Sequence, residues 1–128
     1  MNDAEDATSN KEEYAITLFR IGKEAFDEEY KLFKNPDTEL SLWYESIFEN
    51  QSYNILSLAC RCGNIDAYAY IGLCYKYGIS VEKDANLSRK YIEISANESS
   101  GFGCYQLAKI YEEEKNEESN SLAFSYYK

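Results

Sequence analysis

The sequence contains no histidine, and it has one proline and six glycines among its 128 residues. Histidine is the commonest general base and metal ligand, so the usual forms of both sites are missing. No apolar run approaches the roughly 18 residues that a membrane-spanning helix needs. Gly101-Phe102-Gly103 is too short for a phosphate-binding loop. Adjacent carboxylates such as Glu28 and Glu29 diverge on a helix and are expected to be solvated. We therefore expect no enzymatic activity and no cofactor.

Basic residues are also scarce, because 13 lysines and arginines stand against 23 aspartates and glutamates, for a net charge of −10. Such a chain repels nucleic-acid phosphates and anionic membranes, so we expect neither as a partner. A basic protein would be attracted, although the charge could instead serve solubility alone. Residues 1–10 are acidic and polar and lack the basic and apolar segments of a signal peptide. They predict a disordered leader and a cytoplasmic protein.

The cysteines are few and unevenly placed, at Cys60, Cys62, Cys74 and Cys104. A cytoplasmic location predicts reduced thiols. Cys60 and Cys62 are separated by one residue, whereas zinc sites usually have two, and no histidine completes a ligand set. We expect no metal, and we expect the thiols to serve as small core residues.

Apolar and aromatic residues at helical spacing are abundant, with 13 tyrosines and 45% hydrophobic residues. Tyr14, Leu18, Ile21, Ala25 and Phe26 predict an amphipathic helix from about Lys11 to Phe33 with these side chains facing the core. Pro36 ends it. Further helices are predicted between Asp37 and Asn50, between Ser52 and Gly63, from about Ile65 to Tyr77, from Asp84 or Asn86 to about Ala96, from about Ser99 to Glu114, and from about Asn120 to Lys128.

The second half of the chain repeats itself at a spacing of 36 residues, as Tyr75 and Tyr111 illustrate. A fixed period of this length is typical of stacked helical repeats, which present surfaces to other proteins. Gly72 and Gly103 fall inside predicted helices, where glycine costs about 1 kcal/mol relative to alanine. They predict close helix crossings.

Small residues, glycines and a tyrosine recur in a fixed order at Ala59, Cys60, Gly63, Ala67, Ile71, Gly72, Tyr75, Gly78, Val81, Asp84 and Tyr91. This pattern resembles the Sel-one-like repeat family, a relative of the tetratricopeptide repeats. A second copy keeps Leu107, Ala108, Tyr111 and Tyr127 but has lost the glycine, valine and aspartate of the connecting loop. The resemblance implies an all-α fold that forms a right-handed α-α superhelix, a short solenoid of antiparallel helix pairs. It covers residues 59–128 and leaves 11–58 as divergent N-terminal helices.

Secreted members of this family pair two cysteines eight positions apart in each repeat. In this chain, the position that would pair with Cys60 is occupied by Tyr68, and the position that would pair with Cys104 is occupied by Ala96. Each pair is half present, so the resemblance implies no such disulfide.

The candidate partner-binding residues depend on which helices line the groove of the solenoid. If the first helix of each pair does so, the 36-residue period places six residues on one line: Tyr70, Leu73, Tyr77, Gln106, Lys109 and Glu113. Tyrosine is favoured at interfaces, although these tyrosines could instead cover neighbouring helices. The acidic run from Glu112 to Glu118 could engage a basic partner or form a solvated loop.

The resemblance implies a binding protein without chemistry of its own. We expect the partner to be another protein, a basic one such as a toxin or effector. Small size and acidic charge fit a bacterial immunity-type protein that neutralises a basic toxin. The alternative is an adaptor or scaffold module of a larger assembly, or a fragment of a longer repeat protein.

Overall fold

The computed structural model describes residues 3–35, 51–114 and 126. Its helices are α1 (Asp3–Lys34), α3 (Gln51–Arg61), α4 (Ile65–Tyr77), α5 (Ala85–Asn97) and α6 (Gly101–Glu113). The described residues contain no strand, which confirms the expected all-α class. The helix expected between Asp37 and Asn50 lies outside the described residues. The last expected helix does too, apart from Tyr126, which is helical.

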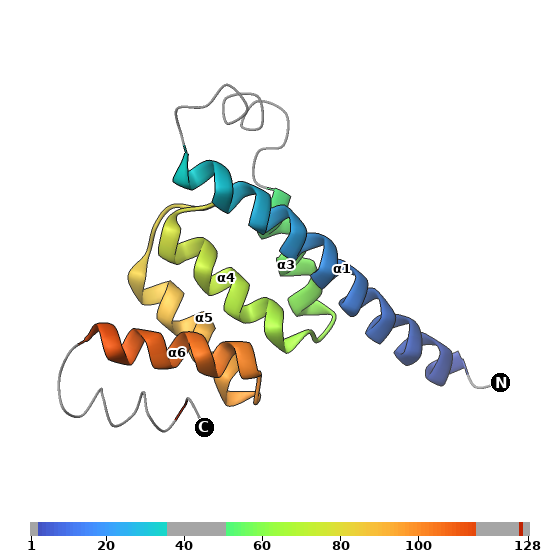
Figure 1. The fold of residues 1–128 in the computed structure, drawn as a ribbon. Coiled ribbons are helices and arrows are strands. Elements are labelled where there is room, and N and C mark those ends of the chain that lie inside the picture. The colour runs from blue at the N-terminus through green and yellow to red at the C-terminus, as the bar shows by residue number, and fades with distance from the viewer. Residues whose placement is uncertain (1–2, 36–50, 115–125, 127–128) are drawn as a thin grey trace.

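The helices pack in chain order, each on the next one described, and α4 also contacts both α1 and α6. In Figure 1, α1, α4 and α6 follow one another from top to bottom and all end on the left of the view. Helices α1 and α3 thus form one antiparallel pair, and α4 and α5 form a second. Helix α6 then packs on α5, at the place that a third pair would begin.

Helix α1 is longer than the sequence predicted, and only part of its expected face is directed at the core, where Phe26 is buried and Leu18 is partly buried. It begins at Asp3, within the segment expected to be a disordered leader. Tyr14 and Ile21, which were expected to face the core, are 63% and 41% exposed. The cause is that α3 crosses α1 at Gly22, where an added Cβ would lie 2.9 Å from the side chain of Leu56. This close crossing sets the rotation of α1 about its own axis.

Gly72 and Gly103 lie at close helix crossings, as the sequence predicted. A Cβ added to Gly72 would lie 2.5 Å from Cγ1 of Ile92, and one added to Gly103 would lie 2.5 Å from Oγ of Ser95. Close packing between helices offsets the low helix propensity of glycine. Gly22 has the same role between α1 and α3, and the sequence analysis missed it.

The crossing of α1 with α3 corresponds to the crossing of α4 with α5. Leu56 opposes Gly22 and Ile92 opposes Gly72, and both opposing side chains are fully buried. Leu56 and Ile92 are 36 residues apart, whereas the two glycines are 50 apart. The first pair therefore has the same crossing as the second, although the chain from the glycine to the opposing side chain is 14 residues longer in the first pair (34 against 20).

The junctions that lead into α4 and α6 also correspond at this spacing. The side chain of Asn64 accepts a hydrogen bond from the N–H of Ala67 at 2.9 Å. Oγ of Ser100 accepts one from the N–H of Gly103 at the same distance. Each residue caps its helix by satisfying an N–H that has no partner within the helix. The 36-residue spacing seen in the sequence is thus present in the hydrogen bonds that cap α4 and α6.

Candidate partner-binding face

The six predicted site residues lie on α4 and α6, some inside the protein and some at its surface. Tyr70, Leu73 and Gln106 are buried, and Tyr77 and Lys109 are half-buried. Glu113 is exposed. Their role in binding stays a prediction.

Tyr70 packs against aromatic rings from two other helices. Its ring centre lies 5.6 Å from that of Phe19 and 5.4 Å from that of Phe26, both on α1. It also stacks on Phe102 of α6 at 4.7 Å. Burial raises the pKa of Tyr70 to about 12. Tyr70 therefore joins α1, α4 and α6 beneath the surface.

Tyr77 belongs to a more accessible aromatic strip near the C-terminal ends of α1 and α4. Its ring centre lies 5.0 Å from that of Tyr30 and 5.8 Å from that of Phe33. Both tyrosines are half-buried, and Phe33 is 47% exposed. We call Tyr30 and Tyr77 the tyrosine pair. Aromatic side chains of this kind are common anchors in protein interfaces.

Lysines from α1 and α4 lie over the rings of the tyrosine pair, and Lys109 of α6 is one helical turn from Glu113, the ion-pair partner of Lys76. Nζ of Lys34 lies 5.0 Å from the centre of the Tyr30 ring, and Nζ of Lys76 lies 5.5 Å from the other ring. The hydrogen bond with Lys34 lowers the pKa of Tyr30, and the nearby charge of Lys109 lowers it further. Lys76 also forms an ion pair with Glu113 at 3.3 Å. The aromatic–lysine face is the surface formed by Tyr30, Phe33, Lys34, Lys76, Tyr77 and Lys109.

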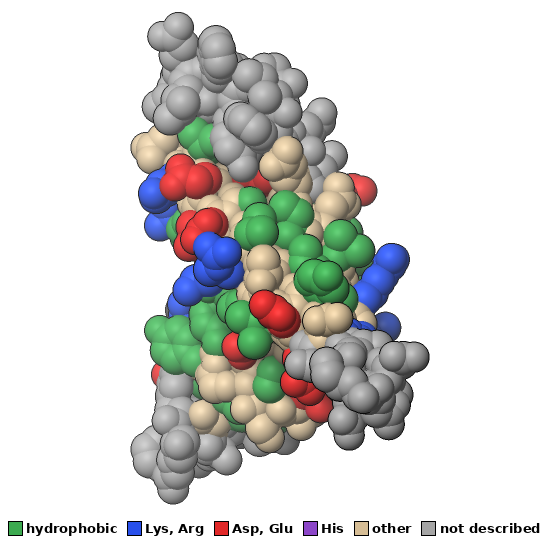
Figure 2. Space-filling view, turned by 90° about the vertical axis from the view of Figure 1, so that its right-hand side faces the viewer, with side chains coloured by type: hydrophobic (Ala, Val, Ile, Leu, Met, Phe, Trp, Pro, Cys, Tyr) green, Lys and Arg blue, Asp and Glu red, His purple; other side chains and the backbone are tan. Residues whose placement is uncertain are grey.

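The neighbouring surface of α1 carries the opposite charge. Glu24, Asp27 and Glu28 line a shallow cavity of about 600 Å³ together with Tyr30 and Lys31. Tyr30 thus stands between an acidic surface and a lysine-rich one. Figure 2 shows one side of the molecule, on which hydrophobic side chains gather with acidic and basic side chains around them.

A second group of tyrosines lies between α3, α4 and α5. The hydroxyls of Tyr53 and Tyr75 are 3.1 Å apart, and this hydrogen bond together with burial raises the pKa of Tyr75. Tyr91 stacks on Tyr75 at 5.7 Å and on Tyr68 at 6.5 Å. All four are half-buried. Their rings therefore pack between neighbouring helices.

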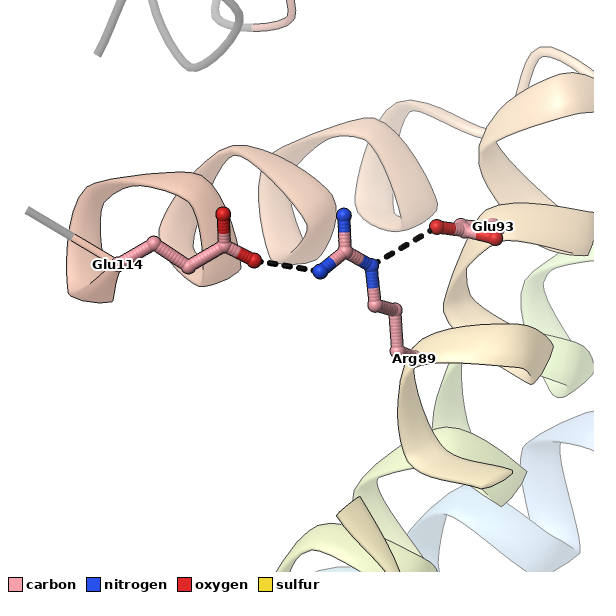
Figure 3. Close-up of polar contacts among 3 residues, drawn as sticks. All are labelled: Arg89, Glu93 and Glu114. Atoms are coloured by element: carbon pink, nitrogen blue, oxygen red, sulfur yellow. Dashed lines mark hydrogen bonds and ion pairs between the residues drawn. The ribbon is translucent and has the colours of Figure 1, made fainter. Parts of the chain in front are cut away.

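Arg89 connects α5 to the end of α6 (Figure 3). Its Nε donates to Glu93 at 3.0 Å, and its Nη1 donates to Glu114 at 2.5 Å. The guanidinium also lies 5.3 Å from the centre of the Tyr111 ring. A cation over an aromatic face contributes about 0.5–1 kcal/mol at a partly exposed site. The sequence analysis missed Arg89, because Glu114 lies on another helix and nothing in the local pattern marks the contact.

Glu29 is buried, contrary to the expectation that it is solvated. Its carboxylate accepts hydrogen bonds from the N–H of Ser52 at 3.3 Å and from the Ser52 hydroxyl. The hydroxyl of Ser80 donates to it at 3.0 Å. A carboxylate is stabilised at a helix N-terminus, where N–H groups point outward. Glu29 therefore ties α1 to the start of α3 and to the loop after α4.

The described residues hold no group of three or more His, Cys, Asp or Glu side chains that could bind a metal ion. All four cysteines are free thiols. Burial raises the pKa of both Cys60 and Cys74 to about 12, which disfavours the reactive thiolate. Within the part of the chain that the structure describes, no helix combines the length and the apolar character needed to cross a membrane.

Comparisons with known proteins add no relative to this description. No protein-family model matches the chain, and no match is found among the curated proteins or the solved structures. The resemblance to Sel-one-like repeats therefore stays a prediction from the residues that carry it. The structure itself defines an all-α protein with an aromatic–lysine face over α1, α4 and α6.

Proposed function

We propose that the chain is a non-enzymatic protein-binding module, built as a short right-handed solenoid of antiparallel helix pairs. Its partner binds the aromatic–lysine face. The observation that carries this proposal is the exposure of Phe33 beside the tyrosine pair, at a place where side chains from three helices meet. Accessible aromatic side chains that converge from several elements are typical of protein interfaces.

The contacts between helices support the solenoid. In such folds the first helices of successive pairs lie side by side and line one continuous face. Helix α4 contacts α1 on one side and α6 on the other, as that arrangement requires. The glycine crossings and the helix caps that recur between pairs add to this support.

The test uses the full chain as bait and two matched surface variants. Phe33→Ser removes an aromatic ring from the proposed face, and Leu58→Ser removes an apolar side chain of nearly equal exposure, 46% against 47%, from α3. We expect the same partner to be captured by the wild type and by Leu58→Ser, and to be lost or weakened at least about tenfold in Phe33→Ser. Equal retention by all three baits would show that this face does not bind the partner.

A second candidate is an immunity-type protein that neutralises a basic toxin in the cytoplasm. The acidic surface of α1 favours it, because Glu24, Asp27 and Glu28 line the cavity there and the whole chain carries a charge of −10. Co-expression with the product of the neighbouring upstream gene tests it. Protection of the cell that is lost in Glu24→Gln/Asp27→Asn would support this role. An upstream product that harms no cell would leave the chain an adaptor or scaffold module.

A further inference from the structure

We propose that the aromatic–lysine face binds an acidic segment of a partner protein, in which carboxylates flank an aromatic or apolar side chain. This inference rests on the proposed function, because it names the chemistry of the partner at the same face. It runs against the overall charge of the chain, which by itself favours a basic partner.

Local charge favours an acidic ligand at this face. Lys34 and Lys76 lie over the rings of the tyrosine pair, and Lys109 is one helical turn from Glu113, the ion-pair partner of Lys76. One carboxylate, that of Glu113, is placed among them by its ion pair with Lys76. Two of the three ammonium charges therefore have no carboxylate opposite them in the ion pairs of the described residues. An arriving carboxylate would be attracted by these charges at short range. Repulsion by the other acidic residues of the protein is weaker there, because they are more distant and are screened by salt.

Two of these lysine side chains are already held in position by aromatic rings. Lys34 sits over the Tyr30 ring, and Lys109 sits over the ring of Tyr105 at 5.4 Å. Side chains held in this way lose less conformational entropy when they bind an anion. Phe33, which lies beside them, offers an exposed apolar contact for a hydrophobic side chain of the same segment.

The charges along α1 favour one direction of the bound segment. Glu24, Asp27 and Glu28 precede Tyr30 on this helix and line a cavity with it, whereas Lys34 follows Tyr30. An acidic segment is repelled from that side and attracted to the lysines, so its carboxylates point towards α4 and α6. The carboxylates that precede Tyr30 and the lysines at the tyrosine pair therefore determine the orientation of the bound segment as well as its composition.

The experiment measures binding of short fluorescein-labelled peptides to the full chain by fluorescence anisotropy. One peptide alternates glutamate with phenylalanine, and its matched control replaces every glutamate by glutamine. We expect the glutamate peptide to bind more tightly and to weaken as salt is raised. Lys34→Gln/Lys109→Gln should weaken its binding about fivefold, since two surface charges are lost. The control Lys23→Gln/Lys90→Gln removes the same charge at two other exposed lysines and should leave binding unchanged.

Equal binding of both peptides, or equal losses in both double variants, would overturn the inference about acidic segments. The proposed function would still stand if Phe33→Ser lost a partner whose binding is unchanged by the lysine substitutions. If Phe33→Ser keeps its partners, the proposed function fails whatever the peptides do. The two failures are therefore distinguishable.

Discussion

The junction between α3 and α4 and the junction between α5 and α6 follow the same backbone path with different side chains. In the first, Gly63 has a φ of 96°, and the N–H that follows it donates to the carbonyl of Ala59 at 3.0 Å. In the second, Ser99 has a φ of 69°, and the N–H that follows it donates to the carbonyl of Ser95 at 3.1 Å. Backbone hydrogen bonds thus keep the turn the same even where glycine has been replaced.

The side chains between the helices differ far more. Tyr53 and Tyr75 share a hydrogen bond across the first junction at 3.1 Å. The corresponding positions in the second are Arg89 and Tyr111, which form a cation–π contact at 5.3 Å. Two helices can therefore be joined at equivalent positions by a neutral hydrogen bond or by a charge. This explains why the sequence shows the 36-residue spacing only faintly.

The largest change in the free energy of unfolding is expected at Gly103, where the second junction has a glycine in place of an alanine. Ala67 at the first junction corresponds to Gly103 at the second. An added Cβ on Gly103 would lie 2.5 Å from Oγ of Ser95 and 2.8 Å from the backbone N of Ala96. Gly103→Ala should lower the free energy of unfolding by about 2 kcal/mol, because overpacking forces the helices apart. Urea denaturation followed by circular dichroism measures this.

Two further variants control that result. Gly101→Ala places a Cβ where no atom lies within 4 Å, so its effect should stay within about 0.5 kcal/mol. Ser95→Ala combined with Gly103→Ala reproduces the Ala59 and Ala67 pair of the first junction and should recover part of the loss. If the double variant lost as much unfolding free energy as the two single variants together, the two junctions would be packed differently.

A smaller effect is expected at the charged contact of the second junction. Arg89→Met removes the ion pairs to Glu93 and Glu114 and the cation–π contact with Tyr111. The free energy of unfolding should fall by about 1 kcal/mol, and the difference from wild type should shrink at high salt. Arg20→Met is the control, because its ion pair at 4.0 Å is largely exposed and should contribute almost nothing. Equal effects of the two changes in denaturation at low salt would contradict the account of Arg89.

Effects of this size or smaller, with opposite signs, are expected at the two turns. Gly63→Ala introduces a side chain at a left-handed φ with no neighbour within 4 Å, so conformation alone sets its cost of about 1 kcal/mol. Ser99→Gly relieves the same strain and should raise the free energy of unfolding. The gain should be only about 0.5 kcal/mol, because the greater freedom of glycine in the unfolded chain offsets part of it. Midpoints of thermal unfolding that move in the same direction would contradict a shared turn.

Helices with strong local signals were predicted well from the sequence. Helix α4 has the bounds expected for it, and Asp84, one of the two starts expected for the next helix, is the residue that caps α5. Caps and turns depend on residues close in the chain, which a sequence shows directly. The exposure of Tyr14 and Ile21 was missed, because the part of α1 that α3 covers depends on the distant contact of Gly22 with Leu56.

The candidate site was less predictable than the fold. The 36-residue period selected Tyr77, Lys109 and Glu113, which are at least partly accessible, yet it also selected three buried residues, Tyr70, Leu73 and Gln106. The 36-residue period relates positions on α4 to equivalent positions on α6, but it carries no information about α1. Phe33 and its neighbours on α1 lie outside the period, so their contribution to the face is visible only in three dimensions.

The central claim is that both junctions have one geometry, and two single substitutions test it most directly. The Sγ of Cys104 lies 3.7 Å from the carbonyl oxygen of Ala96, across the second junction. Ala96→Cys should therefore form a disulfide with Cys104, and Tyr68→Cys should form one with Cys60 at the corresponding positions of the first junction. Peptide mapping by mass spectrometry of the oxidised, non-reduced chains identifies the pairs. The account predicts both intramolecular bridges; a bridge at one junction alone, or pairing with Cys62 or Cys74 instead, would contradict it.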